Sequence, residues 1–90
     1  MRLDKFLKVS RLVKRRTVAK EFADAGRVLL NGVESKASSS VKVGDQLSIQ
    51  YGQKTLIIEV NHLAESIHKA AAADMYSIIE EKAHTDHSLF

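Results

Sequence analysis

Residues 1–20 read MRLDKFLKVSRLVKRRTVAK and hold eight of the fourteen Lys and Arg residues of this 90-residue chain, with Asp4 as their single acid. Eight bases less one acid give this stretch a net charge of +7, whereas the six bases and ten acids of residues 21–90 give −4. The overall charge of +3 therefore hides a strongly polarised molecule. Such a charge layout attracts polyanions to one face, so a ligand with a phosphate backbone is the first hypothesis.

Two short amphipathic helices are predicted within and just after this stretch. Over residues 3–10, apolar residues recur at i, i+3 and i+4 and form one helix face, namely Leu3, Phe6 and Leu7. Thr17 has the side chain of a good N-cap for a second helix, and Gly26 suits the left-handed residue that ends one. The buried face of the second helix would comprise Val18, Ala19, Phe22 and Ala23. Neither helix is long enough to persist alone, so we expect these apolar faces to pack together.

The rest of the chain predicts short strands and one further helix, and thus the α+β fold class. Alternating or β-branched residues predict strands at 27–30, 33–36, 46–51 and 55–60. Asn31-Gly32 separates the first two of these runs and is the strongest short signal for a hairpin. A C-terminal helix around 72–82 is predicted from an alanine run and apolar residues that would pack on the sheet: Ala70 to Ala73, Met75, Ile78 and Ile79.

Composition argues against an enzyme. Ninety residues, 44% hydrophobic and 28% charged, suit one globular domain whose core is too thin for a deep catalytic pocket. Without cysteine there is no disulfide framework and no thiolate metal site, which fits a reducing compartment, so we expect a cytoplasmic protein. No apolar run reaches the length of a membrane span, and the charged N-terminus is unlike a secretory signal. The tract His84-Thr85-Asp86-His87 is expected to lack a rigid element beneath it, so no metal site or cofactor is predicted.

The basic residues lie at helical spacings, so a folded surface would display them. Packing of the two helices would gather cationic groups near a helix start, where backbone N–H groups also favour anions. A solvated charged surface is the alternative, although eight bases beside one acid repel one another without a polyanion. Duplex DNA fits less well, because the second helix offers Lys20, Glu21 and Asp24 outside its apolar face in place of base readers. With two Tyr, three Phe and no Trp, base stacking is also disfavoured, which leaves structured RNA recognised by shape and backbone.

An ordered set of motifs resembles the RNA-binding domain named for ribosomal protein S-four. Over residues 2–50 these motifs are Arg2-Leu3-Asp4-Lys5-Phe6-Leu7, Arg11, Lys14-Arg15-Arg16-Thr17, Ala19, Gly26-Arg27-Val28, Asn31-Gly32 and Gly44-Asp45. The resemblance implies two short N-terminal helices packed on a small twisted antiparallel sheet, the alpha-L RNA-binding motif, with RNA bound by the helices and the adjacent loop. It implies an RNA-binding domain at 1–62 and a C-terminal helical extension at 63–90.

The whole chain is similar to small stand-alone members of this family that act in ribosome-associated quality control. The similarity implies a non-enzymatic factor that binds the large ribosomal subunit, through 23S rRNA, and the P-site peptidyl-tRNA of stalled complexes. It also implies support of C-terminal alanine tailing by a partner elongation factor. The factor is expected to be a monomer with no membrane partner.

The residues expected to bind RNA are assigned from the basic helices and, position by position, from this resemblance. They are Arg2, Asp4, Lys5, Arg11, Lys14, Arg15, Arg16, Thr17 and Lys20. Arg2 and Arg16 would bind phosphates, whereas the Asp4 carboxylate would orient neighbouring arginines or serve as a helix N-terminal acid. Thr17 is either a cap alone or a phosphate contact. Weaker candidates are Arg27, Asn31, which the turn itself explains, and Lys36.

Other hypotheses stay open at this point. The chain also resembles, more distantly, a ribosome-associated heat-shock protein, which implies a recycling factor for large subunits that carry peptidyl-tRNA. A regulatory nucleic-acid-binding protein off the ribosome is a further alternative. So is an adaptor whose basic face binds an acidic protein.

Overall fold

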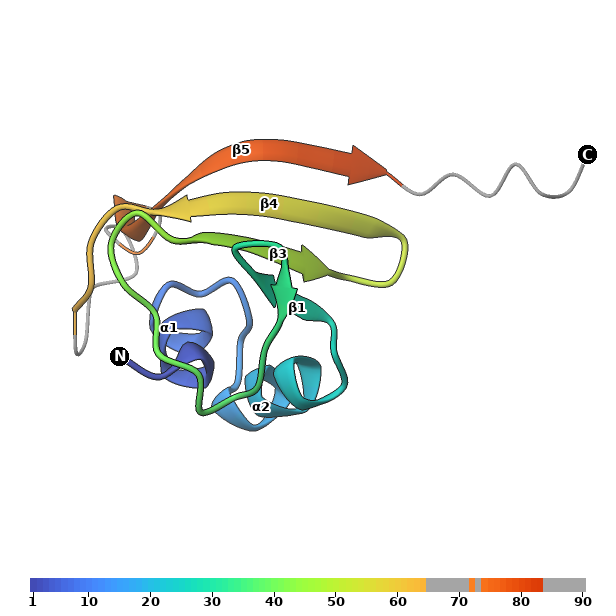
Figure 1. Cartoon of the computed structure of the whole chain (residues 1–90), viewed down its shortest axis with the longest axis horizontal. Coiled ribbons are helices and arrows are strands. Elements are labelled where there is room, and N and C mark those ends of the chain that lie inside the picture. The colour runs from blue at the N-terminus through green and yellow to red at the C-terminus, as the bar shows by residue number, and fades with distance from the viewer. Residues whose placement is uncertain (65–71, 73, 84–90) are drawn as a thin grey trace, which may run out of the picture.

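The computed structural model describes residues 1–64, 72 and 74–83, which form two helices and a five-stranded sheet. In chain order the elements are α1 (Leu3–Val9), α2 (Arg16–Asp24), β1 (Val28–Leu30), β2 (Val33–Glu34), β3 (Gln46–Gln50), β4 (Lys54–Val60) and β5 (Tyr76–Ala83). The strand order is β2-β1-β3-β4-β5, and every neighbouring pair is antiparallel. Figure 1 shows both helices on one side of the sheet, with β5 at the edge far from them. The expected α+β class and the two N-terminal helices are confirmed. Neither helix is long and apolar enough to cross a membrane.

The core lies where the two helices cover the sheet. Phe6 is its largest fully buried side chain and lies in α1 beside Leu3 and Leu7. The other elements contribute Ala19, Ala23, Val28, Leu47, Ile49, Ile58 and Val60. Leu47 and Ile49 alternate with more exposed residues along β3, as a strand with one covered face requires. Phe22 departs from expectation, because its ring is only half-buried at the margin of this core.

Two chain reversals follow the predicted turn chemistry. Gly26 has φ of +77°, a left-handed conformation that favours glycine. The N–H of Arg27 donates to the Phe22 carbonyl at 2.9 Å and that of Gly26 to the Ala23 carbonyl at 3.1 Å, so α2 ends in a Schellman motif. Asn31 and Gly32 have φ of 53° and 82°, as the two-residue turn between β1 and β2 demands. Both predictions are confirmed.

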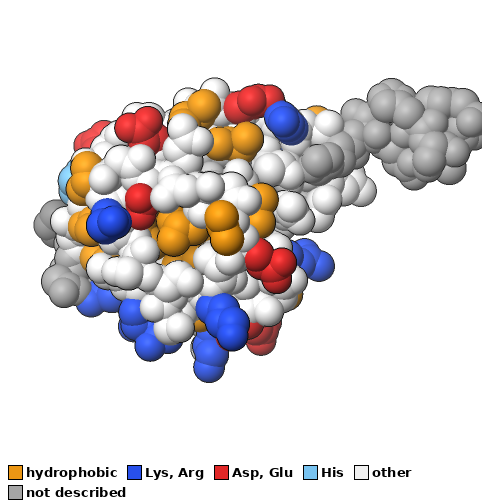
Figure 2. All heavy atoms as spheres, viewed as in Figure 1, with side chains coloured by type: hydrophobic (Ala, Val, Ile, Leu, Met, Phe, Trp, Pro, Cys, Tyr) orange, Lys and Arg blue, Asp and Glu red, His pale blue; other side chains and the backbone are white. Residues whose placement is uncertain are grey.

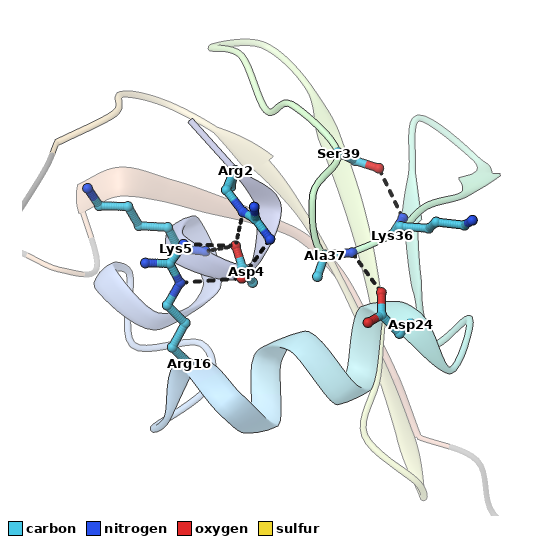
Figure 3. Close-up of polar contacts among 8 residues, drawn as sticks. All are labelled: Arg2, Asp4, Lys5, Arg16, Asp24, Lys36, Ala37 and Ser39. Carbon is cyan, nitrogen blue, oxygen red and sulfur yellow. Dashed lines mark hydrogen bonds and ion pairs between the residues drawn. The ribbon is translucent and has the colours of Figure 1, made fainter.

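Residues 35–41 cross the start of α1 and tie it to α2. The N–H of Leu3 donates to the Ser39 carbonyl at 2.8 Å, and that of Asp4 donates to the Ala37 carbonyl at 3.2 Å. These bonds satisfy two N–H groups that an isolated helix leaves without partners. The Ala37 N–H in turn donates to the Asp24 carboxylate of α2 at 3.1 Å (Figure 3). The N-terminal residues are therefore held in place from outside their own helix.

The C-terminal helix predicted around 72–82 is wrong over residues 76–82, which belong to strand β5. This strand pairs along β4 from Val60↔Tyr76 to Lys54↔Ala83, with a register shift at Ile57/Ile58. Without β5, the β-branched strand β4 would present an unpaired edge, and pairing along that edge outweighs the weak helix preference of this stretch. Met75 is buried as expected, but Ile78 and Ile79 are 59% and 48% exposed. Most of the alanine run and the tract 84–87 lie outside the described residues.

Candidate nucleic-acid interface

A buried carboxylate joins two arginines at the point where α1 and α2 begin. Arg2 Nε lies 3.2 Å from Asp4 Oδ1, and Arg16 Nε lies 3.3 Å from Asp4 Oδ2. Each guanidinium also turns Nη2 toward the carboxylate, at 3.5 Å for Arg2 and 3.4 Å for Arg16 (Figure 3). Arg2 and Asp4 are close together because they are two residues apart in the sequence. Arg16 lies beside Asp4 only because the two helices pack against each other. We call this group the Arg2–Asp4–Arg16 cluster.

Asp4 has both of the roles that the sequence left as alternatives. Its Oδ1 accepts the backbone N–H of Lys5 at 2.8 Å, as an acid in the first turn of a helix does. It also orients both arginines, as described above. Burial alone would raise the pKa of Asp4, but hydrogen bonds from Arg16, Arg2 and the Lys5 N–H, with the charge of Arg16, lower it below 3.8. The carboxylate is therefore ionised at neutral pH.

The Arg2–Asp4–Arg16 cluster is suited to binding a phosphate backbone. The Asp4 side chain is 5% exposed, whereas those of Arg2 and Arg16 are 52% and 49% exposed. Two of the five N–H donors of each guanidinium face Asp4, which leaves the other three for a ligand. The carboxylate fixes the direction of both guanidinium groups while remaining almost entirely buried. One acid between two bases leaves a net charge of +1, so the cluster still attracts anions.

The other predicted residues lie on the same two helices and their connection. Lys5 is half-buried on α1, and the other five are exposed, namely Arg11, Lys14, Arg15, Thr17 and Lys20. Figure 2 shows Lys and Arg side chains gathered along the side of the molecule that carries α1 and α2 in Figure 1. Most of the visible Asp and Glu side chains lie away from that side, over the rest of the face. The charge polarity of the sequence is thus a polarity of the folded surface.

Thr17 is not the N-cap of α2, and that prediction is wrong. The cap is Arg15, whose backbone is extended at φ −124° and ψ 140° and which makes no side-chain cap bond. The Ala19 N–H donates to the Arg15 carbonyl at 3.0 Å, so the helix begins two residues earlier than a Thr17 cap would allow. Arg16 in the first turn of α2 is instead bonded through its side chain to Asp4, which ties the start of this helix to α1. Thr17 remains exposed in that first turn, where a phosphate contact stays a prediction.

Arg11 adopts a backbone conformation that is unusual for its residue type. Its φ is +64°, immediately after the C-cap residue Ser10 of α1. The Arg11 N–H donates to the Lys8 carbonyl at 3.0 Å, and the Val13 N–H reaches the Leu7 carbonyl at 3.0 Å. These bonds close the end of α1, a place where glycine is usual. An arginine here accepts backbone strain and places a cation in the connection between the helices.

Replacing Arg11 with glycine is expected to stabilise the fold and weaken RNA binding together. Relief of the left-handed strain should raise the free energy of unfolding by about 1 kcal/mol. Arg11→Ala removes the same charge but keeps the strain, so it should show the binding loss without the gain in stability. Urea denaturation of both variants checks this difference. Equal free energies of unfolding for Arg11→Gly and Arg11→Ala would show that the backbone at this position is not strained.

Tyr51 anchors the connection between the helices to the sheet. Its hydroxyl donates to the Leu12 carbonyl at 2.7 Å. Burial and, less strongly, the neighbouring Tyr76 raise the pKa of Tyr51 from 10.0 to about 12. The folded chain therefore holds the phenol proton more tightly than the unfolded chain does. The stability that Tyr51 contributes is full below pH 10 and is lost as the pH rises toward 12.

Tyr51→Phe should lower the free energy of unfolding by about 1 kcal/mol near pH 8, because one hydrogen bond is lost. This advantage of the natural chain should shrink above pH 10 and be lost as the pH rises toward 12, because only the tyrosine has a proton to lose. Denaturation of both chains at several pH values measures the difference directly and cancels the titration of the lysines. A difference that stays constant up to pH 12 would disprove the assignment.

Comparison with known proteins identifies the family. The model of the S4 domain matches residues 1–47 of the chain. The RQC P-site tRNA stabilizing factor of Bacillus subtilis is 57% identical over 82 residues, which cover 91% of this chain and 95% of that protein. The chain therefore belongs to the S4 domain family, in the group of the RQC P-site tRNA stabilizing factors. The protein of that name from Listeria monocytogenes is 52% identical over 88 residues, which cover 98% of this chain and 95% of that protein.

A solved structure of a more distant relative shares the fold. Heat Shock Protein 15 of Vibrio cholerae, described as trimeric, superposes with a TM-score of 0.81 at 29% identity. The match covers 87% of this chain and 80% of that one. By sequence, the Heat shock protein 15 homolog of Haemophilus influenzae is 32% identical over 75 residues, or 83% of this chain and 57% of that protein. Both helices and the sheet thus form a shared scaffold.

Proposed function

We propose that this chain is a non-enzymatic factor that binds the large ribosomal subunit and the P-site peptidyl-tRNA of stalled complexes. The RNA contacts are made by α1, α2 and their connection, and on the ribosome they reach 23S rRNA. Holding the tRNA there supports C-terminal alanine tailing by a partner elongation factor. The protein acts in the cytoplasm.

The observation that carries this proposal is the Arg2–Asp4–Arg16 cluster. Two half-exposed guanidinium groups are held in one direction by a buried carboxylate, so little side-chain entropy remains to be lost when phosphate binds. A surface that was merely solvated would not need a buried acid to orient its bases. The names of the similar Bacillus and Listeria proteins, RQC P-site tRNA stabilizing factor, support P-site tRNA as the RNA target.

Equilibrium binding to two kinds of purified large subunit tests the target. We expect tighter binding to subunits that carry P-site peptidyl-tRNA than to empty subunits, because the tRNA supplies additional phosphates. Equal affinity for both particles would mean that the chain binds ribosomal RNA but does not contact the tRNA. In cells that lack the chain, stalled peptides should lose their alanine tails, and tails that persist would contradict the role in tailing.

Asp4→Asn distinguishes an oriented cluster from a general positive field. The change makes the protein more positive by one unit, so a simple field would bind RNA more tightly. We expect binding to be about fivefold weaker instead, because asparagine keeps one acceptor oxygen but presents an NH2 donor in place of the other, so the two guanidinium groups no longer share a carboxylate. Glu21→Gln on the exposed side of α2 is the matched control, since it changes the charge equally and should bind at least as well as the natural chain. Tighter binding by Asp4→Asn would refute the orienting role.

A heat-shock-type role is the second candidate, and the TM-score of 0.81 with Heat Shock Protein 15 favours it. In this role the chain would help to recycle large subunits that carry peptidyl-tRNA, without any part in tailing. The two functions separate in cells that lack the chain. Loss of alanine tails supports the first, whereas accumulation of blocked large subunits with normal tails supports the second.

We propose that the chain acts as a monomer, although the similar Vibrio cholerae structure is described as trimeric. One copy already contains the complete Arg2–Asp4–Arg16 cluster, so the site needs no second subunit. Sedimentation equilibrium of the purified chain decides the matter. A mass three times that of one chain would replace the monomer with a trimer.

A further inference from the structure

An apolar hollow of about 410 Å³ opens beside the connection between the two helices. Its apolar lining is formed by Leu12, Val13, Val18, Phe22 and Tyr51. The exposed residues Lys14 and Arg15 complete the lining. The volume falls within the range of about 300–1,000 Å³ that is usual for sites that take a small organic group. The apolar hollow adjoins the basic surface described above, since Lys14 and Arg15 belong to both.

The aromatic part of the apolar hollow is held in a defined geometry. The centroids of the Phe22 and Tyr51 rings lie 6.0 Å apart, with their planes at 58°. The Tyr51 hydroxyl is bonded to the Leu12 carbonyl at 2.7 Å, which joins β3 and its following turn to the connection between the helices. Phe22 is fixed at the end of α2 by the packing of that helix. The hollow is therefore preformed, and a ligand would meet two positioned rings.

Four cationic side chains lie in the lining of the apolar hollow or over its two rings. Lys14 and Arg15 stand in the lining itself, and none of its seven described residues is acidic. The Arg27 guanidinium carbon lies 5.5 Å from the Phe22 ring centroid, and Lys54 Nζ lies 5.8 Å from that of Tyr51. An occupant that combines an apolar planar group with an anion would match both features. A nucleotide has this combination, with its base as the planar group and its phosphate as the anion.

We propose that the apolar hollow binds one unpaired nucleobase of the RNA, packed against Phe22 and Tyr51, while Lys14 and Arg15 bind its phosphate. This inference rests on the proposed function and adds a base contact to a surface expected to read only the backbone. The lining offers few polar groups to the edge of a base, so stacking discriminates little between bases. The site therefore requires an unpaired nucleotide at a given place and accepts several bases there.

An NMR titration of the natural chain tests the base contact. The probes are uridine and adenosine 5′-monophosphate, with ribose 5-phosphate and inorganic phosphate as controls that lack a base. Both nucleotides should shift the methyl signals of Val13 and Val18 and the ring signals of Phe22 and Tyr51, and the controls should shift only the backbone signals of Lys14 and Arg15. If ribose 5-phosphate produces the same shifts as the nucleotides, or if none of the four shifts the pocket signals, the base contact is refuted.

A variant separates this inference from the proposed function. Phe22→Leu keeps an apolar side chain but removes the ring, and the ring is only half-buried, so the fold should survive. Binding to large subunits should weaken by about tenfold, the size of one base–aromatic stack, with no change in its salt dependence, because no phosphate contact is lost. If Phe22→Leu binds as the natural chain does, the base pocket is disproved while the function stands. If the natural chain itself does not bind, the proposed function fails.

An acidic peptide with one large apolar side chain could fill the same hollow, and a competition decides between the two. A short peptide such as Ac-Asp-Leu-Asp is added to the same NMR sample. We expect it to shift the pocket signals less than either nucleotide at equal concentration. Larger shifts by the peptide would overturn the proposal in favour of a protein partner.

Discussion

Replacing Arg2 and Arg16 together with alanine is expected to weaken binding to large ribosomal subunits by about a hundredfold. Each guanidinium contributes a charge-assisted contact with phosphate worth about 1.5 kcal/mol, and the two act at adjacent places on one backbone. The slope of log K against log salt should fall by about 1 for each lost contact. Equilibrium binding at several salt concentrations measures both quantities for the single and double variants.

The control for this experiment removes one cation elsewhere. Lys82→Gln changes the net charge by the same unit as either single arginine variant, on β5, where Lys82 pairs with Glu80. A general attraction would weaken equally in the control and in each single arginine variant. Our account expects at most a small loss for the control, because its charge lies on the sheet side of the molecule. If the double arginine variant had the same salt slope as the natural chain, neither arginine would contact a phosphate.

Phe6→Ala is expected to cost about 3–5 kcal/mol of the free energy of unfolding. The ring is 0% exposed and packs between the helices and the sheet, so its loss leaves a cavity that neighbouring side chains only partly fill. A chain of this length has a total stability of roughly 5–13 kcal/mol, so the variant would be close to unfolding at 37 °C. Urea denaturation followed by circular dichroism gives the value.

Val33→Ala serves as the comparison for Phe6→Ala. Val33 lies in β2 and is 68% exposed, so its truncation should change stability by less than about 0.5 kcal/mol. Phe22 offers an intermediate case, since a half-buried ring should cost less than Phe6 when truncated. A Phe6→Ala protein as stable as Val33→Ala would mean that α1 does not pack on the sheet through this ring.

The local parts of the fold could be predicted from the sequence. The spacing of Leu3, Phe6 and Leu7 indicated α1, and these three residues are fully buried. Gly26 and Asn31-Gly32 indicated two reversals whose backbone angles depend mostly on the residues themselves. Such features involve neighbours along the chain, so single-residue preferences are sufficient to find them.

The parts that the sequence did not predict depend on distant contacts. Strand β5 pairs with the edge of β4, which lies far from it in the sequence. The local pattern of residues 76–83 contains no signal of that edge. The contact between Arg16 and Asp4, twelve residues earlier in the chain, forms only when the two helices pack. Thr17 carried the stronger local capping signal, yet α2 begins one residue before it, at Arg16.

The candidate site shows the same division. Its cationic residues could be predicted by counting charges and from the family motifs. The orienting role of Asp4 could be predicted because a carboxylate repels phosphate, so its place among the arginines indicates a contact with them. The apolar hollow was not predicted, because Leu12 and Tyr51 are 39 residues apart and meet only in the fold. The composition had suggested too few aromatic residues for base stacking, whereas the fold places two half-buried rings 6.0 Å apart in the proposed base pocket.

Sedimentation of the purified chain with large ribosomal subunits that carry P-site peptidyl-tRNA tests the central claim most directly. In low salt the chain should move with the particles, and increasing salt should release it along a linear log–log slope of about 0.9 for each phosphate contact. Duplex DNA at the same phosphate concentration should compete poorly, because the proposed surface is shaped for folded RNA. A chain that remains at the top of the gradient in low salt, or that duplex DNA displaces as readily as ribosomal RNA does, would contradict the account.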